Sequence, residues 1–212
     1  LQPTRTAIKT GDYPLALPIH LYADQRKLPP LGRDLIRYIG ETQGQALVRL
    51  AGYLDLAAEE TPLAMKGDRL LNAVSVAGTE VPVRELRRMS EVLRGGRHLS
   101  LSFRFQPGSS DLDSGSVDNV RRLARLVDAG HFDGKSVLVI GFSDGIGAAD
   151  GNRRIGLGRA EAVAEAAKSV SNSLEDDSVD LVLESFGEAM PIACDDTEWG
   201  RELNRRVEVW VR

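Results

Sequence analysis

Hydrophobic and polar residues along the C-terminal half of the chain follow the periods of strands and helices in turn. Apolar residues alternate with polar ones over 99–105, which predicts a strand with a period of two. The run Val-Leu-Val-Ile at 137–140 is apolar throughout and predicts a strand buried on both faces. The same reasoning predicts strands at 179–183 and 207–211 and helices at 117–127 and 152–170, the second of them capped by Asn152. The order β-α-β-α-β-β indicates an α/β fold of the α+β sandwich type, in which helices pack on a mixed sheet.

The N-terminal half has a weaker pattern. Two prolines favour extended backbone before a predicted strand at Ile19–Tyr22. Residues 31–51 show helical spacing that two glycines interrupt, which predicts two short helices or one kinked helix. Residues 57–69 have the composition of a connector, and 82–94 are predicted to form a helix.

The composition excludes several classes of protein. Of the 212 residues 42% are hydrophobic and 27% charged, as in ordinary globular domains, and no apolar run approaches the roughly 18–20 residues of a membrane span. The single cysteine, Cys194, excludes an intrachain disulfide and a cysteine-based zinc site. The three histidines are scattered, so we expect neither a metal nor a cofactor.

The net charge of −4 hides an asymmetry between the two halves. Residues 1–98 hold 14 Lys and Arg against 11 Asp and Glu, or +3, whereas residues 99–212 hold 13 against 20, or −7. Neither half concentrates basic residues as a duplex-binding surface does, so we expect no nucleic-acid partner.

The glycine-rich loop at 141–151 contains two incomplete motifs. Gly-Phe-Ser-Asp-Gly matches the G-x-S-x-G elbow that presents the nucleophile of a serine hydrolase, here Ser143. About eight residues separate this serine from the next predicted helix, however, and all three histidines precede it, so a hydrolase is a remote alternative. A dinucleotide-binding loop would need a glycine where the chain has Asp150.

Asp144 and Arg159 form a different candidate site. Asp144 follows the buried strand, and Arg159 lies at the edge of the apolar stripe of the next helix. Because that helix packs back against the strand, both charges can face one shallow pocket at the sheet edge. A structural ion pair, or an Asp in a turn with an Arg that reaches solvent, explains the same spacing. Near the C-terminus, Asn204-Arg205-Arg206 has the composition of a solvated charge cluster.

Several spacings together resemble the signature of the OmpA-like peptidoglycan-binding domain, over residues 99–212. The matching residues are Gly141-Phe142-Ser143-Asp144, Gly147, Asn152, Ile155, Arg159-Ala160 and Val163, then Phe186-Gly187-Glu188, Pro191, Thr197, Gly200-Arg201 and Asn204-Arg205-Arg206-Val207-Glu208. The resemblance implies a protein that is not an enzyme and that binds the diaminopimelate of the peptidoglycan stem, with Asp144 on the ammonium and Arg159 on the carboxylate.

The resemblance also implies supporting roles around this pair. It places Phe142, Ser143 and Gly145 in the binding loop, where they supply backbone N–H groups and shape. It implies that Asn152 braces the loop while capping its helix, and that Arg206 lies near the pocket. Two departures from the family pattern are Gly156, where a serine is usual, and Gly158, and each interior glycine costs about 1 kcal/mol relative to alanine.

The N-terminal stretch resembles the C-terminal end of phosphate-type periplasmic substrate-binding proteins. Tyr13-Pro14-Leu15 through Tyr22, Gly44-Gln45-Ala46-Leu47 and Gly52-Tyr53 carry this resemblance, which covers residues 4–57. It implies a partial α/β substrate-binding lobe at 1–60 and a connector with a helix at 61–98, ahead of the OmpA-like domain at 99–212. The phosphate-holding residues of that family lie upstream of this stretch, and Leu1 in place of an initiating methionine favours a fragment of a secreted protein.

Together the two resemblances predict a periplasmic protein anchored to the cell wall. Association with the outer membrane or with an ABC transporter would be compatible with this location. The alternative is a periplasmic phosphate receptor of an ABC transporter in which the OmpA-like part is only a spacer. About 60 residues taken from a larger lobe would expose apolar surface, so we expect residues 1–60 to need a partner surface.

Overall fold

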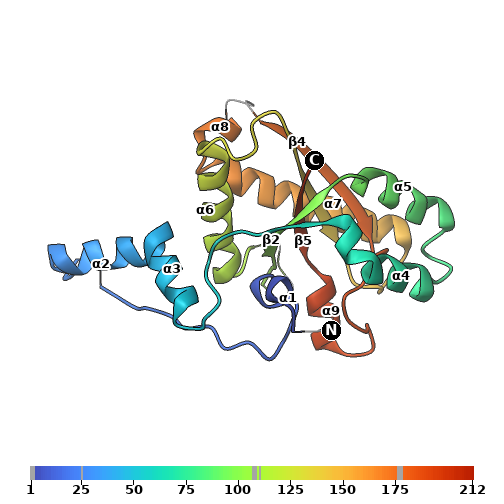
Figure 1. Ribbon diagram of the computed structural model, residues 1–212. Helices are drawn as coiled ribbons and strands as arrows, with labels where there is room; N and C mark the ends of the chain where they lie inside the picture. Colours follow the sequence, from blue (N-terminus) through green and yellow to red (C-terminus); the bar gives the residue numbers. More distant parts are fainter. Residues whose placement is uncertain (1–2, 25, 107–108, 110, 176–178) are drawn as a thin grey trace. The chain divides into compact units, whose positions relative to one another are not determined.

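A computed structural model describes residues 3–24, 26–106, 109, 111–175 and 179–212 (Figure 1). Internal contacts divide the chain into two compact units, Gln2–Glu59 and Glu60–Arg212. In the described ranges, no helix combines the length and the apolar character that crossing a bilayer requires.

A five-stranded open sheet organises the larger unit. Its strands are β1 (Glu60–Pro62), β2 (Arg97–Phe103), β3 (Ser136–Phe142), β4 (Asp180–Gly187) and β5 (Val207–Val211), in the spatial order β1-β2-β5-β3-β4. Only β3 and β4 pair in parallel, whereas the other three pairings are antiparallel. The predicted mixed sheet with packed helices is therefore confirmed.

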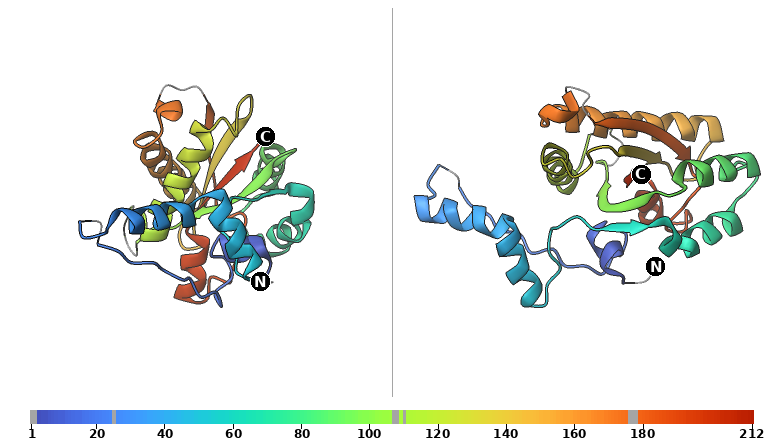
Figure 2. Two further views of the ribbon diagram at one scale, coloured as in Figure 1. Left: turned by 60° about the vertical axis from the view of Figure 1, so that its left-hand side comes forward. Right: turned by 45° about the horizontal axis from the view of Figure 1, so that its top comes forward.

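Helices cover both faces of this sheet (Figure 2). On one face, α6 (Ser114–Asp128) and α7 (Ala149–Lys168) lie side by side, with α7 against β3 and β4. On the other face, α4 (Gly67–Val76) and α5 (Val83–Leu93) share an apolar core with alternate residues of β3 and with Trp210 of β5. Every residue of the predicted apolar run 137–140 is at most 1% exposed, so the prediction of a strand buried on both faces is confirmed.

Two glycines allow α7 to approach β3 closely. A Cβ on Gly156 would lie 2.9 Å from the carbonyl oxygen of Gly141 and would collide with Oγ of Ser185, while a Cβ on Gly141 would collide with the carbonyl of Gly156. Gly156 therefore serves helix–sheet packing rather than only weakening the helix. A Cβ on Gly158, by contrast, would meet open space.

The start of α7 differs from the prediction. The helix begins at Ala149 with Ala148 as its N-cap, so the prediction that Asn152 caps it is wrong. Asn152 lies inside the first turn, is buried, and donates from Nδ2 to Oε2 of Glu188 at 2.6 Å. Two further short helices, α8 (Asn172–Glu175) and α9 (Glu198–Asn204), lie in stretches for which no helix was predicted.

Residues 61–98, predicted as a connector, supply several elements of the larger unit. They contain most of the edge strand β1, a 3₁₀ turn η1 (Leu63–Lys66), α4, and α5 at nearly the predicted 82–94. Arg69 of α4 reaches into the sheet and pairs with the buried Glu208 of β5 at 2.6 Å.

The smaller unit contains α1 (Arg5–Lys9), α2 (Pro30–Gly40) and α3 (Thr42–Leu50), so residues 31–51 form two short helices rather than one kinked helix. An ion pair between Lys9 and the buried carboxylate of Asp55, at 3.0 Å, joins distant parts of the unit. The strand predicted at Ile19–Tyr22 is wrong, because these residues, all described, lie outside any strand and their side chains are largely exposed.

Candidate functional site

The loop at 143–148 connects β3 to α7 at one edge of the sheet. Because β3 and β4 run parallel, the segment that follows β4 leaves the sheet at the same edge. Gly147 has φ of +101° and Gly187 has φ of +53°, backbone conformations that favour glycine over other residues. Two chain segments about 40 residues apart therefore meet around the residues predicted to bind a ligand.

Asp144 is partly buried and pairs with Arg205. Nη1 of Arg205 donates to Oδ2 of Asp144 at 2.8 Å, and Nη2 donates to Oε1 of Glu198 at 2.6 Å. Burial lowers the pKa of Arg205, but its hydrogen bonds to the two carboxylates raise this pKa further, so the net shift is upward. The sequence analysis groups Arg205 with its neighbours in a solvated charge cluster and gives it no role in the site. Arg205 is therefore a site residue that the sequence analysis misses.

Arg159 lies close to this pair but takes no part in it. Its Nη1 donates to the carbonyl oxygen of Phe142 at 3.2 Å, and its guanidinium carbon lies 5.5 Å from the ring centroid of Phe105. Among the residues that the structure describes, no carboxylate lies within 4.0 Å of the Arg159 nitrogens. Burial lowers the pKa of Arg159, and Asp144 opposes this shift while Arg205 adds to it. Three charges, two positive and one negative, therefore act on one another at this edge.

The loop residues predicted to support the site already use most of their backbone donors internally. The N–H of Phe142 donates to Arg206 and that of Ser143 to Gly187, both to carbonyl oxygens. The N–H of Gly145 donates to Oδ2 of Asp195 at 2.8 Å, and a Cβ at this glycine would lie 2.6 Å from that same oxygen. The loop is thus held in place by the segment that follows β4.

The side chains of Phe142 and Arg206 belong to the core rather than to the surface of the site. Both are essentially unexposed, and the Arg206 guanidinium lies 4.2 Å from the centre of the Phe142 ring. Arg206 also donates to Glu208 at 2.7 Å and to the carbonyl oxygen of Met190 at 2.9 Å. The Arg206 side chain is buried against the residues that flank the loop, so the interpretation of this residue as part of a solvated charge cluster is wrong.

Ser143 lacks the surroundings of a nucleophile. Its side chain is buried, and its Oγ contacts no hydrogen-bond partner in the described part of the chain. A serine nucleophile needs an adjacent general base, so this geometry argues against the hydrolase alternative. Within the described residues, no three His, Cys, Asp or Glu side chains gather as metal ligands would.

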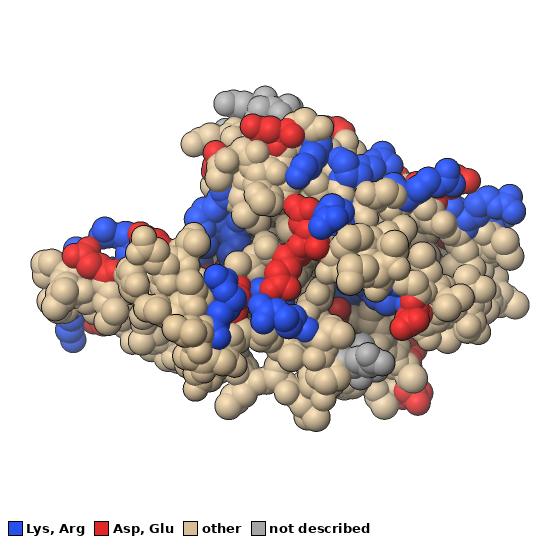
Figure 3. All heavy atoms as spheres, viewed as in Figure 1, with Lys and Arg blue, Asp and Glu red and all other residues tan. Residues whose placement is uncertain are grey.

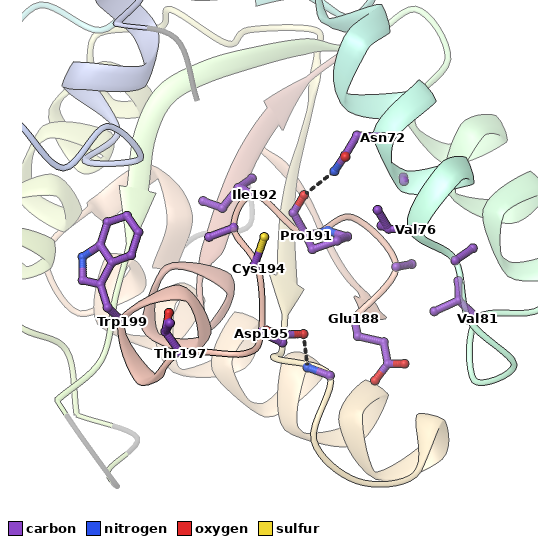
Figure 4. A pocket seen from close by; sticks show the side chains of 16 residues that line it. Asn72, Val76, Val81, Glu188, Pro191, Ile192, Cys194, Asp195, Thr197 and Trp199 are labelled. Atoms are coloured by element: carbon purple, nitrogen blue, oxygen red, sulfur yellow. Dashed lines mark hydrogen bonds between the residues drawn. The ribbon is translucent and has the colours of Figure 1, made fainter.

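A groove of about 550 Å³ opens beside the loop, on the side of α4 (Figure 4). Helix α4 and the turn that follows it line the groove with residues that include Asn72, Val76 and Val81, and the segment after β4 lines it from Glu188 to Trp199. Of the predicted site residues only Gly145 lines this groove, so Asp144 and Arg159 lie outside it. Burial raises the pKa of Glu188, and neighbouring carboxylates add to that shift.

Basic and acidic side chains are interspersed on the face drawn in Figure 3. The net charge of the domain is screened in salt, so individual charges would hold a ligand only at short range.

Comparison with known proteins gives one family match. Residues 104–205 match the model of the OmpA family, and these residues form an OmpA-like domain. No curated protein matches the chain.

Three solved structures are similar to part of the chain. The peptidoglycan-associated lipoprotein from Burkholderia pseudomallei is 22% identical, with 52% of this chain and 89% of that chain covered and a TM-score of 0.44. The C-terminal domain of Helicobacter pylori MotB is 22% identical, with 52% and 83% covered and a TM-score of 0.43. The cell wall anchor of the T6SS from Pseudomonas aeruginosa is 24% identical, with 60% and 94% covered and a TM-score of 0.41.

Proposed function

We propose that the OmpA-like domain binds peptidoglycan non-covalently through the diaminopimelate of its peptide stem, and thereby anchors this chain to the cell wall in the periplasm. The family match supports the class of ligand. The observation that carries the proposal is Arg159, a partly buried cation with no carboxylate partner among the described residues, next to the carboxylate of Asp144.

The chemistry of the ligand complements these charges. Diaminopimelate ends in an ammonium and a carboxylate on the same carbon. The Arg159 guanidinium offers a planar fork that binds a carboxylate through two parallel hydrogen bonds, and its hydrogen bond within the described residues goes from Nη1 to the carbonyl oxygen of Phe142. A bound carboxylate would supply the negative charge that Arg159 lacks and would reverse the unfavourable effect of its burial.

Asp144 would accept hydrogen bonds from the ligand ammonium. Its Oδ2 already accepts from Arg205, and its Oδ1 accepts a long bond of 3.4 Å from the N–H of Ile146. A carboxylate oxygen has two lone pairs, so both oxygens retain capacity. In this proposal Arg205 fixes the orientation of Asp144, and it limits how strongly the aspartate attracts the ammonium.

Pull-down on purified diaminopimelate-containing peptidoglycan tests the site. Asp144→Ala and Arg159→Ala should each weaken binding about tenfold or more, because each removes a hydrogen bond to a charged group. Matched controls are Arg154→Ala, an exposed arginine on the same helix, and Asp196→Ala, an exposed aspartate near the groove. If both site variants bind like the parent protein, the assignment is wrong.

A second ligand separates the two roles. Peptidoglycan that carries lysine in place of diaminopimelate keeps the side-chain ammonium but lacks the neighbouring carboxylate. The parent protein should bind this material about as weakly as Arg159→Ala binds the diaminopimelate form. Equal binding of both forms by the parent would refute the role of Arg159 while leaving peptidoglycan binding intact.

The fused substrate-binding lobe stays a prediction from residues 4–57. Calorimetry with inorganic phosphate on this chain tests it directly, since the sequence resemblance implies that the phosphate-holding residues lie upstream of these positions. Heat of binding at a single site would favour the phosphate-receptor alternative over a simple cell-wall anchor.

A further inference from the structure

The groove beside α4 has features that the proposed peptidoglycan site does not use. One wall comes from α4 and the turn that follows it, at residues 72–81, and the other from residues 188–199 (Figure 4). The first wall lies outside the segment 104–205 that matches the OmpA family. We propose that this groove binds a short segment of a partner protein that presents a lysine or arginine beside aliphatic residues. This proposal is independent of peptidoglycan binding.

The groove exposes apolar side chains. Val76 of α4 is 54% exposed and Trp199 of α9 is 47% exposed, and Pro191 and Ile192 lie between them in the view of Figure 4. A volume of about 550 Å³ lies within the range of roughly 300–1,000 Å³ that is typical of ligand pockets. Aliphatic side chains of a partner would bury this surface, and the exposed indole offers a face to the stem of a long basic side chain.

One end of the groove carries two carboxylates, Glu188 and Asp195, that form no ion pair with the described lysines and arginines, although Arg201 donates to the backbone carbonyl oxygen of Asp195 at 2.7 Å. Glu188 accepts a hydrogen bond from the neutral amide of Asn152, and Asp195 accepts from the N–H of Gly145 and from the Asn204 amide. Within the described residues, no lysine or arginine nitrogen lies within 4.0 Å of either carboxylate.

Burial and the neighbouring carboxylates act in the same direction on the pKa of Glu188. Burial raises its pKa, and the carboxylates of Glu80, Asp195 and Asp144 raise it further. A cation placed at this end would relieve that repulsion. The groove therefore favours a basic side chain over a neutral or acidic one, because a positive ligand charge meets a negative surface.

Asn72 holds the two walls together at the opposite side of the groove. Its Nδ2 donates to the carbonyl oxygen of Pro191 at 3.2 Å. This bond links α4 to the loop after β4, so the walls are positioned before a ligand arrives. A groove that is already formed spares a ligand the cost of ordering it.

Cys194 provides a built-in reporter for the test. It is the single cysteine of the chain, it is exposed, and it lines the groove. Its rate of modification by a methanethiosulfonate reagent therefore measures both the local potential and the occupancy of the groove. After division by its rate with free N-acetylcysteine, a cationic reagent should react at least about fivefold faster than an anionic one, because the negative groove attracts it.

Two matched peptides then test recognition on the full chain. Acetyl-Gly-Leu-Lys-Leu-Gly-amide should protect Cys194 in a saturable manner, and its counterpart with glutamine in place of lysine should need about fivefold more peptide for the same protection. Glu188→Gln should remove this difference and the preference for the cationic reagent. Glu165→Gln, on the outer part of α7, is the matched control and should change neither.

Three outcomes would overturn the proposal. The first is equal protection by both peptides, or protection by neither at the highest soluble concentration. The second is a Glu188→Gln variant that keeps the parent's preference for the lysine peptide. The third is protection that rises with protein concentration in the absence of peptide, which would assign the groove to a second copy of this chain.

Discussion

Gly156 is the residue at which the packing of α7 on the sheet is tested most directly. Gly156→Ala places a methyl group against Oγ of Ser185 and 2.9 Å from the carbonyl oxygen of Gly141. An alanine in a helix interior gains about 1 kcal/mol over glycine, whereas overpacking of a closed interface costs about 1–3 kcal/mol. Because one of the opposing atoms is backbone, we take the upper part of that range and expect a net loss of about 1–2 kcal/mol in the free energy of unfolding.

Gly158→Ala is the matched control, two residues further along the same helix. Its methyl group would meet nothing within 4 Å, so it should stabilise the unit by about 1 kcal/mol through helix propensity alone. The two alanine variants should thus differ by about 2–3 kcal/mol in opposite directions from the parent. The double variant Gly156→Ala with Ser185→Ala removes the Oγ contact but not the backbone contact, and should recover part of the loss.

Urea unfolding followed by tryptophan fluorescence provides the measurement. Both tryptophans, Trp199 and Trp210, lie in the larger unit, so the signal reports the unit that contains α7. If Gly156→Ala is as stable as Gly158→Ala, the close approach of α7 to β3 is not a feature of the protein in solution. The position of Arg159, one turn further along α7, would then need revision as well.

Three further predictions concern buried charges. Glu208→Gln removes the carboxylate that Arg69 contacts, and it should lower the free energy of unfolding by about 3 kcal/mol in the same urea assay. A loss under about 1 kcal/mol would refute the buried ion pair. Burial lowers the pKa of His98 well below 6.5, although Glu208 opposes this shift, so below pH 6.5 the unfolded chain takes up a proton at this histidine and the folded chain does not. The free energy of unfolding should therefore fall below pH 6.5, by up to about 1.4 kcal/mol per pH unit. His98→Phe should flatten that slope. Burial raises the pKa of Asp55, but bonds from Lys9 and other donors lower it more, and Asp55→Asn should speed tryptic cleavage within Gln2–Glu59 while leaving the larger unit intact.

The elements that could be predicted from sequence are those whose burial follows from the pattern of their own residues. Four consecutive apolar residues at 137–140, followed by a glycine-rich loop, favour a short strand covered on both faces, and the structure has it. Ile19–Tyr22 shows the opposite case. Its residue types suit a strand, but a strand also needs a neighbour with which to pair, and the local sequence contains no information about that neighbour.

The features that could not be predicted from sequence depend on contacts between residues far apart along the chain. Asparagine is a frequent N-cap, yet Asn152 lies in the first turn of α7, where its amide donates to Glu188, 36 residues further along the chain. In the pair Arg205-Arg206 both residues have the same local chemistry. Which of them is buried depends on the register with which β5 enters the sheet, and that register turns Arg206 inward and Arg205 towards Asp144.

The strand order β1-β2-β5-β3-β4 has a consequence for how this domain can be moved between proteins. The segment 104–205 that matches the OmpA family model leaves out β2 and β5, and β5 lies in the middle of the sheet. An excised piece with those ends would lose its central strand together with Arg69, which neutralises Glu208 within that strand. The unit to transfer is therefore Glu60–Arg212, because a gene fusion or duplication that carried only residues 104–205 would lack the middle strand of the sheet.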